Sequence, residues 1–290
     1  MLAKRIPTIL PALTLEESLE TTRVYSSRGL LPAGKALMAL RPVRSPHHNT
    51  SASALVGGGV VPQPGEVSLA HHGVLFLDEF PEFARATLEM IRQPLEDGCV
   101  TIPRVHSTLK FPARIMLVAA MNPCPCGYYT DRNKQCKCSP VAIERYMGRI
   151  SGPLIDRIDI HVEVPPVPWR QLRGDAVGET LSSAQMRAQV LSARQIQRRR
   201  FGDHGDGKTA VDSTTTNASM SPRQVRQFCK IDSAGESLLK QAVTELGLSA
   251  RAHDKVLRIA RTIADLETQE AIQPHHLAEA IQYRRLDRRL

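Results

Sequence analysis

Aromatic side chains are scarce in this 290-residue chain, at 4% of its residues, and no run of eighteen consecutive apolar residues occurs. Because apolar residues still make up 42% of the chain, the core has to be built from aliphatic side chains. The lack of a long apolar run argues against a membrane-spanning helix. The opening segment MLAKRIPTILPAL has two cations and two prolines where a signal peptide has an apolar centre, so we expect a cytoplasmic protein with no membrane partner.

Acidic residues are fewer than basic residues in this chain. The chain has 38 Lys and Arg against 29 Asp and Glu, a formal net charge of +9. The arginines gather in two clusters, Arg194, Arg198, Arg199 and Arg200, and Arg284, Arg285, Arg288 and Arg289. This imbalance favours a polyanionic partner, and solvated helix faces with a charged tail are the alternative.

The pattern of apolar residues changes character along the chain. A continuous apolar run at 73–77 and a second apolar segment at 114–121 predict strands of a buried parallel sheet, and the segment at 157–164 predicts a third strand. A Pro-, Gly-, His- and Ser-rich stretch at 41–65 predicts a long functional loop, and alternation at 99–111 predicts a hairpin. From 180 onward the pattern is helical, with helices expected at 180–200, 222–230, 232–246, 249–266 and 274–283. We therefore expect an α/β core over 1–165, a linker over 166–179 and an α-helical domain over 180–290.

Two of the predicted strands end in polar side chains suited to phosphate chemistry. The first ends at Asp78 and Glu79, and the second ends at Asn122. At the carboxyl edge of a sheet, Asp78 could orient Mg²⁺, Glu79 could polarise an attacking water, and Asn122 could hold that water near the γ-phosphate. A strand that simply surfaces at two acids is the alternative. Arg157, at the start of the third predicted strand, could supply a positive charge.

Four segments, in this order, resemble one known family. GVLFLDEF, AAMNPCPCGYY, RYMGRISGPLIDRIDIHVEV and SARAHDKVLRIARTIADL resemble the Walker B, sensor 1, arginine-finger and sensor 2 regions of Mg-chelatase-like AAA+ ATPases of the ComM/YifB type. The resemblance implies a P-loop AAA+ parallel-sheet core followed by a helical lid, with ATP and Mg²⁺ as cofactors and a ring of identical subunits, expected to be hexameric. It also implies that Arg157 acts as a finger on a neighbouring subunit, with Arg149 as a weaker candidate, and that Arg251 is the sensor 2 residue.

The phosphate-binding loop of that family is the feature we do not find in its expected place. The family carries a Gly-Lys-Thr or Gly-Lys-Ser loop directly before a helix that resembles MLAKRIPTILPAL, so we expect the chain to begin just after this loop and to bind nucleotide weakly by itself. The segment at 202–209 matches G-x-x-x-x-G-K-T, with Lys208 in the lysine position. We interpret this match as coincidental, because it follows an Arg-rich helix instead of a strand and includes two aspartates.

A cysteine cluster follows Asn122 within the predicted sensor loop, 122–140. It consists of Cys124, Cys126, Cys136 and Cys138. Two close pairs of soft ligands predict a structural Zn²⁺, with reduced thiols or a labile disulfide as alternatives. The histidine pairs at 47–48 and 71–72 are interpreted as hydrogen-bonding loop or core residues, with metal ligation as the alternative.

Three functions stay open at this level. The first is a DNA motor acting on single-stranded or branched DNA in competence or recombination, including branch migration, in which Arg104, His106 and Lys110 of the hairpin would contact the nucleic acid backbone. The second is a chelatase-type ATPase subunit that remodels a protein partner. The third is a module that joins rings without hydrolysing ATP. Whether the chain is an active enzyme stays uncertain without a phosphate-binding loop.

Overall fold

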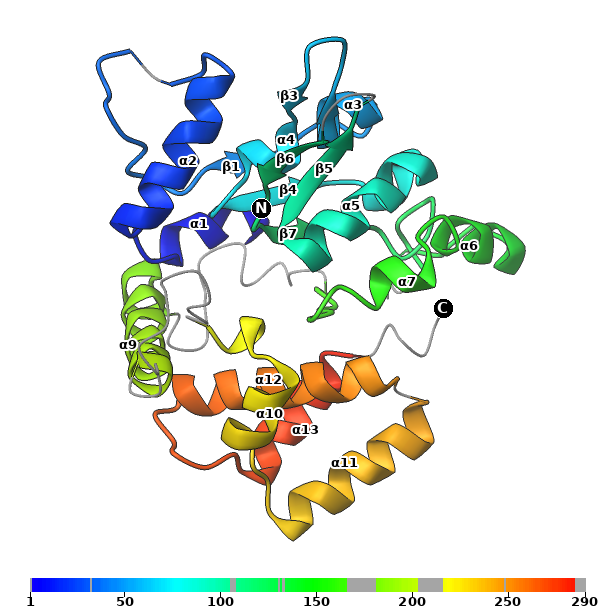
Figure 1. Cartoon of the computed structure of the whole chain (residues 1–290). Coiled ribbons are helices and arrows are strands. Elements are labelled where there is room, and N and C mark those ends of the chain that lie inside the picture. Colours follow the sequence, from blue (N-terminus) through cyan, green and yellow to red (C-terminus); the bar gives the residue numbers. More distant parts are fainter. Residues whose placement is uncertain are drawn as a thin grey trace. The chain divides into compact units, whose positions relative to one another are not determined.

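The computed structural model describes residues 2–31, 33–104, 108–129, 131, 134–165, 181–202, 216–247 and 249–284. The chain divides into two compact units, Met1–Arg157 and Ile158–Leu290, whose elements are labelled in Figure 1. The first is a mixed α/β unit and the second is helical, as predicted. The predicted domain boundary at 165 lies a few residues beyond this division, and the linker at 166–179 lies outside the described residues.

Unit 1 contains every strand of the described residues, together with several helices. Its helical elements are η1 (Leu2–Arg5), α1 (Ile6–Ile9), α2 (Leu15–Ser27), α3 (Ala52–Val56), α4 (Glu66–Leu69), η2 (Phe80–Glu82), α5 (Arg85–Asp97), α6 (Pro140–Met147) and α7 (Gly152–Ile155). Its strands are β1 (Val43–Arg44), β2 (Gly57–Gly58), β3 (Gln63–Pro64), β4 (Val74–Leu77), β5 (Cys99–Pro103), β6 (Thr108–Pro112) and β7 (Met116–Ala119).

A three-stranded parallel sheet, in the order β1-β4-β7, forms the centre of unit 1. Every residue of β4 is buried, which explains its continuous apolar sequence. In the register of the two longer strands, Val74 lies opposite Met116 and Leu77 lies opposite Ala119. The strand β7 is more open, and Met116 is 44% exposed. The carboxyl ends of β4 and β7 are therefore neighbours at one edge of the sheet.

Local signals in the sequence explain where the helices begin and end. The side chain of Thr14 accepts a hydrogen bond from the backbone N–H of Glu17, whose carboxylate accepts one from the backbone N–H of Thr14, so a capping box begins α2. At the C-terminal end of α5, Gly98 adopts a left-handed conformation with φ of 63°, which ends that helix before the β5–β6 hairpin.

Two predictions about unit 1 and its border were wrong. The stretch at 41–65 is not a continuous loop, because it contributes β1 to the sheet, a short helix and the small β2–β3 hairpin. The predicted strand at 157–164 does not form. Its alternating apolar residues have no neighbouring strand among the described residues, and Val162 is 66% exposed. The backbone N–H of His161 donates instead to the carbonyl of Tyr283, at 2.8 Å.

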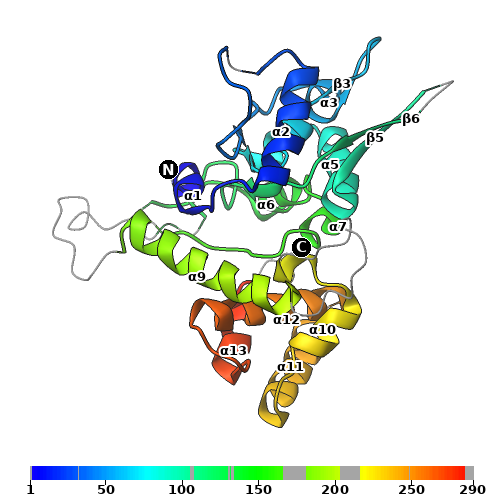
Figure 2. The ribbon, with the colours of Figure 1, turned by 60° about the vertical axis from the view of Figure 1, so that its left-hand side comes forward.

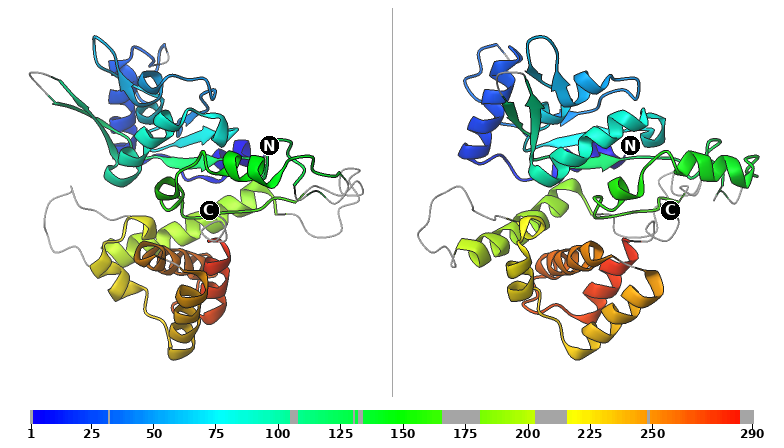
Figure 3. Two further views of the ribbon diagram at one scale, coloured as in Figure 1. Left: turned by 90° about the vertical axis from the view of Figure 1, so that its right-hand side faces the viewer. Right: turned by 45° about the vertical axis from the view of Figure 1, so that its right-hand side comes forward.

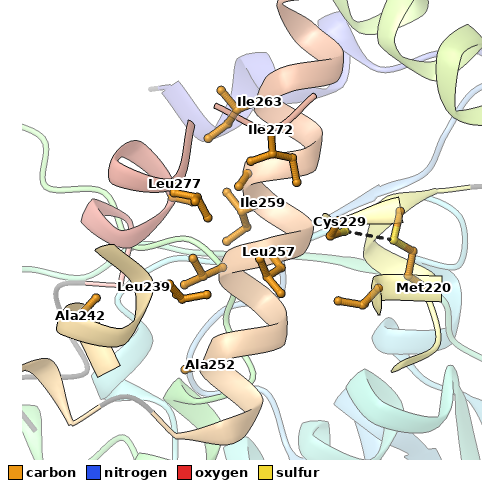
Figure 4. Close-up of a cluster of buried hydrophobic side chains, with 14 residues drawn as sticks. Met220, Cys229, Leu239, Ala242, Ala252, Leu257, Ile259, Ile263, Ile272 and Leu277 are labelled. Atoms are coloured by element: carbon orange, nitrogen blue, oxygen red, sulfur yellow. Dashed lines mark hydrogen bonds between the residues drawn. The ribbon is translucent and has the colours of Figure 1, made fainter. Parts of the chain in front are cut away.

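Unit 2 is a helical bundle, shown in yellow-green to red in Figure 3. Its elements are α9 (Ser183–Gly202), η3 (Asn217–Ser219), α10 (Pro222–Phe228), α11 (Ser233–Leu246), α12 (Ala250–Leu266) and α13 (Pro274–Gln282). All five predicted helices are confirmed. Aliphatic side chains along α12, including Leu257, Ile259 and Ile263, pack in one cluster with Leu239 of α11 and Leu277 of α13 (Figure 4). Among the described residues no helix combines the length and the apolarity needed to cross a membrane.

A buried polar network braces this bundle. Asp265, fully buried, accepts hydrogen bonds from the guanidinium groups of Arg200 and Arg261 and from the side-chain amide of Asn217. Arg261 also donates to the carbonyls of Gln269 and Glu270. Burial lowers the pKa of Arg261, and the Asp265 carboxylate opposes that shift. One arginine of the predicted basic cluster, Arg200, therefore has a structural role instead of facing solvent.

Candidate functional site

The edge where β4 and β7 end collects the predicted phosphate-handling side chains of unit 1. The backbone N–H of Phe80 donates to the carbonyl of Ala120 at 2.9 Å, which ties the segment after β4 to the segment after β7. Asp78 and Glu79 both project into solvent from this edge, and Asp78 accepts a hydrogen bond from the backbone N–H of Glu79 at 3.0 Å. Exposed carboxylates on a rigid, buried strand are free to meet a metal ion or a water molecule.

Glu79 adopts an unusual backbone conformation and has a histidine partner. Its φ of 53° and ψ of 45° lie in the left-handed region, which is rare for a residue other than glycine and is found most often at functional sites. Its carboxylate lies 2.9 Å from Nδ1 of His48. The His48 ring contacts the ring of His47 and meets Phe83 edge-on, which restricts its position. His48 thus fixes a carboxylate that the strand itself leaves in solvent.

Asn122 lies three residues after β7, at the start of the cysteine-rich loop. Its side chain approaches Gly127, where an added Cβ would lie 3.8 Å from the amide carbon. Its backbone forms a hydrogen bond with Tyr146 of α6, whose pKa is raised by burial and by the charge of Glu82 despite that bond. The loop that holds Asn122 is therefore attached to both the cysteine cluster and α6.

The two candidate finger arginines differ in how much of each side chain is exposed. Arg157 is only 12% exposed, because it forms an ion pair with Glu96 and donates to the carbonyl of Pro153 at 2.6 Å. Arg149 is 50% exposed and forms an ion pair with Glu82 at 2.7 Å. Arg149 also lines a hollow of about 610 Å³ together with Arg85 and Arg145. The sequence did not predict this group of three arginines. Action on a neighbouring subunit would require Arg157 to leave Glu96.

Arg251 belongs to unit 2. It lies in the first turn of α12, is exposed, and follows the N-cap Ser249, whose side chain accepts from the backbone N–H of Ala252 at 3.1 Å. Its approach to Asp78 stays a prediction. Of the predicted hairpin contacts, Arg104 and Lys110 are exposed on β5–β6, whereas His106 lies outside the described residues, as do Lys208 and most of the 202–209 segment.

The four cysteines of the sensor loop converge. The Sγ atom of Cys124 lies 3.4 Å from the Sγ atom of Cys126 and 3.7 Å from that of Cys136. The Sγ atoms of Cys126 and Cys136 are 3.6 Å apart. With the sulfur of Cys138, all four Sγ atoms lie within 4.8 Å of one another. Four sulfurs at the Zn–S bond length of about 2.3 Å form a tetrahedron with edges of roughly 3.8 Å. The spacing of the thiols therefore fits a tetrahedral zinc site.

The thiols also show the electrostatic pattern of a metal-ligand set. Backbone N–H groups of Tyr128 and Lys137 donate to the Cys126 sulfur and lower its pKa to about 6. An N–H of Cys138 favours the thiolate of Cys136, but burial and the neighbouring thiols outweigh it and raise its pKa to about 12. The Cys126 thiolate is thus stabilised, whereas burial and hydrogen bonds with the neighbouring thiols favour the protonated form of Cys136. A bound cation would favour the thiolate form of its ligands.

Two further clusters contain metal-binding residue types. In unit 1 the Glu20 carboxylate lies 3.0 Å from Nε2 of His71 and 2.8 Å from Nε2 of His72. In unit 2 the Glu267 carboxylate lies 3.2 Å from Nε2 of His275 and 3.0 Å from Nε2 of His276. Each of these clusters gathers two imidazoles around one carboxylate.

The fold and the site define an α/β protein with a parallel-sheet core, polar residues at the carboxyl edge of that sheet, and a helical C-terminal domain. Sequence comparison agrees with this class. Residues 1–172 match the profile of the family described as magnesium chelatase, subunit ChlI, and residues 180–284 match the profile described as magnesium chelatase, subunit ChlI C-terminal. The chain belongs to this Mg-chelatase-like AAA+ family, which confirms the resemblance found in its motifs.

Several curated relatives match the whole chain or nearly all of it. The competence protein ComM of Haemophilus influenzae is 44% identical over 295 residues, and the uncharacterized protein YifB of Escherichia coli is 42% identical over 291 residues; both alignments cover 100% of this chain. A Mycobacterium tuberculosis protein is 38% identical over 98% of the chain. The chain spans about half the length of these relatives, 54% in each case.

Proposed function

We propose that this chain forms most of an ATP-hydrolysing module in which Asp78, Glu79 and Asn122 act at one edge of the parallel sheet. The observation that carries the proposal is the direct pairing of β4 with β7, which brings the ends of these two strands together. Asp78 would hold Mg²⁺ with its waters, Glu79 would polarise the attacking water, and Asn122 would orient that water. Bound Mg²⁺ would neutralise charge on the transferred phosphate. The contact between His48 and Glu79 supports a carboxylate held in a fixed position.

The phosphates need an anchor besides these residues. Among the described residues no glycine-rich loop joins a strand to a helix with a lysine at its start, so we propose that a loop of this kind from sequence ahead of Leu2 completes the site. The half-exposed edge of β7 is consistent with a further parallel strand beside it. Without this loop we expect weak nucleotide binding.

The remaining charged residues would act between subunits or from the helical domain. We propose a homo-oligomeric ring, expected to be hexameric, in which Arg157 reaches the nucleotide of a neighbouring subunit and Arg251 contacts the nucleotide from the lid. Arg149 is the second candidate finger, because its half-exposed side chain lines a hollow with two other arginines, whereas the side chain of Arg157 is only 12% exposed and paired with Glu96. In either case the finger stabilises the negative charge of the transition state.

We propose DNA, single-stranded or branched, as the substrate of this motor. The net charge of +9 and the exposed Arg104 and Lys110 of the β5–β6 hairpin suit a polyanion. A relative that is 44% identical is named a competence protein, which suggests a role in competence or recombination. The second candidate is a chelatase-type subunit that remodels a protein partner, favoured by the description of both family profiles. Salt-dependent DNA binding separates the two.

We also propose a structural Zn²⁺ bound by Cys124, Cys126, Cys136 and Cys138. The sulfur–sulfur distances fit the tetrahedron that four thiolates form around zinc. Because Asn122 lies two residues before the first ligand, the metal would help to fix the position of that amide.

The test of the ATPase proposal compares the chain with a version that carries a glycine-rich phosphate-binding segment ahead of Leu2. Calorimetry should detect ATP binding only in the extended protein. In that protein Glu79→Gln should bind ATP without turnover. Arg157→Ala and Arg149→Ala, tested side by side, should show which arginine lowers turnover by about 10³-fold or more while sparing binding. Lys208→Ala serves as the control and should change neither. Undiminished turnover in Glu79→Gln would contradict the proposal.

A further inference from the structure

The tip of the β2–β3 hairpin presents two apolar side chains to solvent. Val60 is 97% exposed and Val61 is 72% exposed, in the four-residue turn between β2 and β3. Hairpin tips usually carry small or polar residues, because a β-branched apolar side chain gains nothing from facing water. Neither valine packs on the core of unit 1. The hairpin projects from the body of unit 1, as does the β5–β6 hairpin (Figure 2).

The backbone that carries these valines depends on glycine. Gly57, Gly58 and Gly59 have φ values of 111°, 135° and 94°, a region that favours glycine. A Cβ atom on Gly57 would lie 2.6 Å from the carbonyl oxygen of Gln63, so the two strands of the hairpin are closer than any other residue allows. The same atom would lie 3.4 Å from Cδ1 of Ile102 in β5. The tip is therefore held in a set position beside the second hairpin.

Two arginines lie beside the turn that carries the valines. The guanidinium of Arg104, directly after β5, donates to the carbonyl of Gly59, and that of Arg28 donates to the side-chain oxygen of Gln63 at 2.8 Å. Within the described part of the chain, neither arginine forms an ion pair with a carboxylate. Glu66, the acid that follows the hairpin in sequence, is paired with Arg44 at 2.7 Å.

We infer that the β2–β3 tip is an apolar wedge that contacts unstacked bases of DNA, while Arg28 and Arg104 contact the adjacent phosphates. Apolar side chains that enter a base step, flanked by cations on the backbone, are a recurring way to open or hold open stacked DNA. A protein partner would be less well matched by a small apolar tip beside two arginines that form no ion pair within the described residues. The inference rests on the proposed DNA function and adds where the bases lie and which residues separate them.

The experiment uses the full chain and forked DNA that carries 2-aminopurine at the junction, a base whose fluorescence rises when it loses its stacking neighbours. The wild-type chain should raise the fluorescence on binding. The double variant Val60→Ser, Val61→Ser keeps charge and backbone, so its binding to duplex DNA and its salt dependence should be unchanged. Its fluorescence rise should disappear, and its affinity for forked DNA should fall about tenfold, because base contacts are lost while phosphate contacts stay.

Two control variants separate the wedge from other causes. Val141→Ser changes a valine that is also 72% exposed but lies in α6, and it should behave like the wild type. Arg104→Gln should reduce the salt dependence of binding by about one counterion and leave the fluorescence rise per bound chain intact.

Other outcomes would overturn the inference, and they are distinguishable. Binding of forked DNA by the double variant with an undiminished fluorescence rise would remove the valines from this role and leave the DNA function intact. Loss of self-association in the double variant, with DNA binding unchanged, would make the tip a contact between copies. Failure of the wild-type chain to bind DNA at any salt concentration would remove the DNA function and the wedge together.

Discussion

The cysteine loop and the two Glu–His–His clusters all bring metal-binding side chains together, yet their lone pairs are occupied differently. In the loop, the sulfur atoms lie mainly against one another. In the clusters, Nδ1 of His71 accepts from the backbone N–H of Arg114 at 3.0 Å, and Nδ1 of His276 accepts from the N–H of Gln273 at 2.9 Å. Each Nε2 must then carry the hydrogen that it donates to the carboxylate. His71 and His276 could each bind a metal ion through Nε2 only by breaking this backbone bond.

The comparison teaches that residue type and proximity are not sufficient to identify a metal site. A neutral imidazole has one acceptor nitrogen, and a backbone N–H that uses this nitrogen fixes the other one as a donor. The thiols carry no equivalent constraint, because a sulfur that accepts backbone N–H bonds can still bind a metal. The comparison therefore supports the proposal of zinc in the loop, and we propose a structural role for both Glu–His–His clusters.

The largest effect should come from breaking the cysteine set. Cys136→Ser should reduce bound zinc from about one ion per chain to none. It should also lower the melting temperature of unit 1 by about 10 °C, since structural zinc contributes several kcal/mol to folding. Elemental analysis and calorimetry measure the two effects. Cys99→Ser, a cysteine of the same unit outside the loop, is the matched control and should keep its zinc. Equal zinc content in Cys136→Ser and the wild type would refute the assignment.

A smaller effect should follow from pH at the unit 1 cluster. Burial, with the charge of His72, lowers the pKa of His71 to about 4 from an ordinary value near 6.5. Between these values the unfolded chain binds a proton that the folded chain refuses, so stability should be complete above pH 6.5 and fall as the pH drops toward 4. The loss should reach roughly 3 kcal/mol, at about 1.4 kcal/mol per pKa unit.

Urea unfolding at pH 7, 5.5 and 4 tests this dependence. His71→Asn keeps an oxygen that can accept the Arg114 N–H bond but cannot titrate, so its stability should vary less with pH than that of the wild type. Hydrogen bonds from His72 and His71 lower the pKa of Glu20 against the effect of burial. The protonation of Glu20 changes the stability of the fold only below pH 4.5, the ordinary pKa of this group. Parallel pH profiles for His71→Asn and the wild type would contradict the role given to His71.

The smallest effect should come from the unit 2 cluster. Glu267→Gln should leave the zinc content at the wild-type value, because we propose that the Glu267 carboxylate serves as the acceptor of hydrogen bonds from His276 and His275 and not as a metal ligand. These two bonds lower the pKa of Glu267, so they stabilise the fold where the carboxylate is ionised. The Glu267→Gln variant should therefore lose a modest amount of stability only at pH values above the ordinary glutamate pKa. Zinc analysis of the wild type and the variant provides the readout. Loss of an ion in Glu267→Gln would make unit 2 a second metal site.

Local patterns in the sequence predicted much of this fold. The fully apolar run of β4 and the helical pattern from 180 onward each depend on interactions within a few residues, so they can be read directly. The wrong predictions concern pairing. The two-residue strand β1 is too short to give a pattern, and the stretch at 157–164 has the alternation of a strand without a neighbour to bond. Strand formation needs a partner, which the sequence of one segment does not specify.

The candidate site divides in the same way. Residue types and motif order predicted Asp78, Glu79, Asn122 and the four cysteines as chemically suited groups, because these motifs are contiguous. The tertiary structure alone decided that His48 meets Glu79, that Arg157 is tied to Glu96 while Arg149 stays half exposed, and that backbone N–H groups occupy His71 and His276. Such contacts join residues distant in sequence or depend on the direction of a single hydrogen bond, and only the packed chain fixes both.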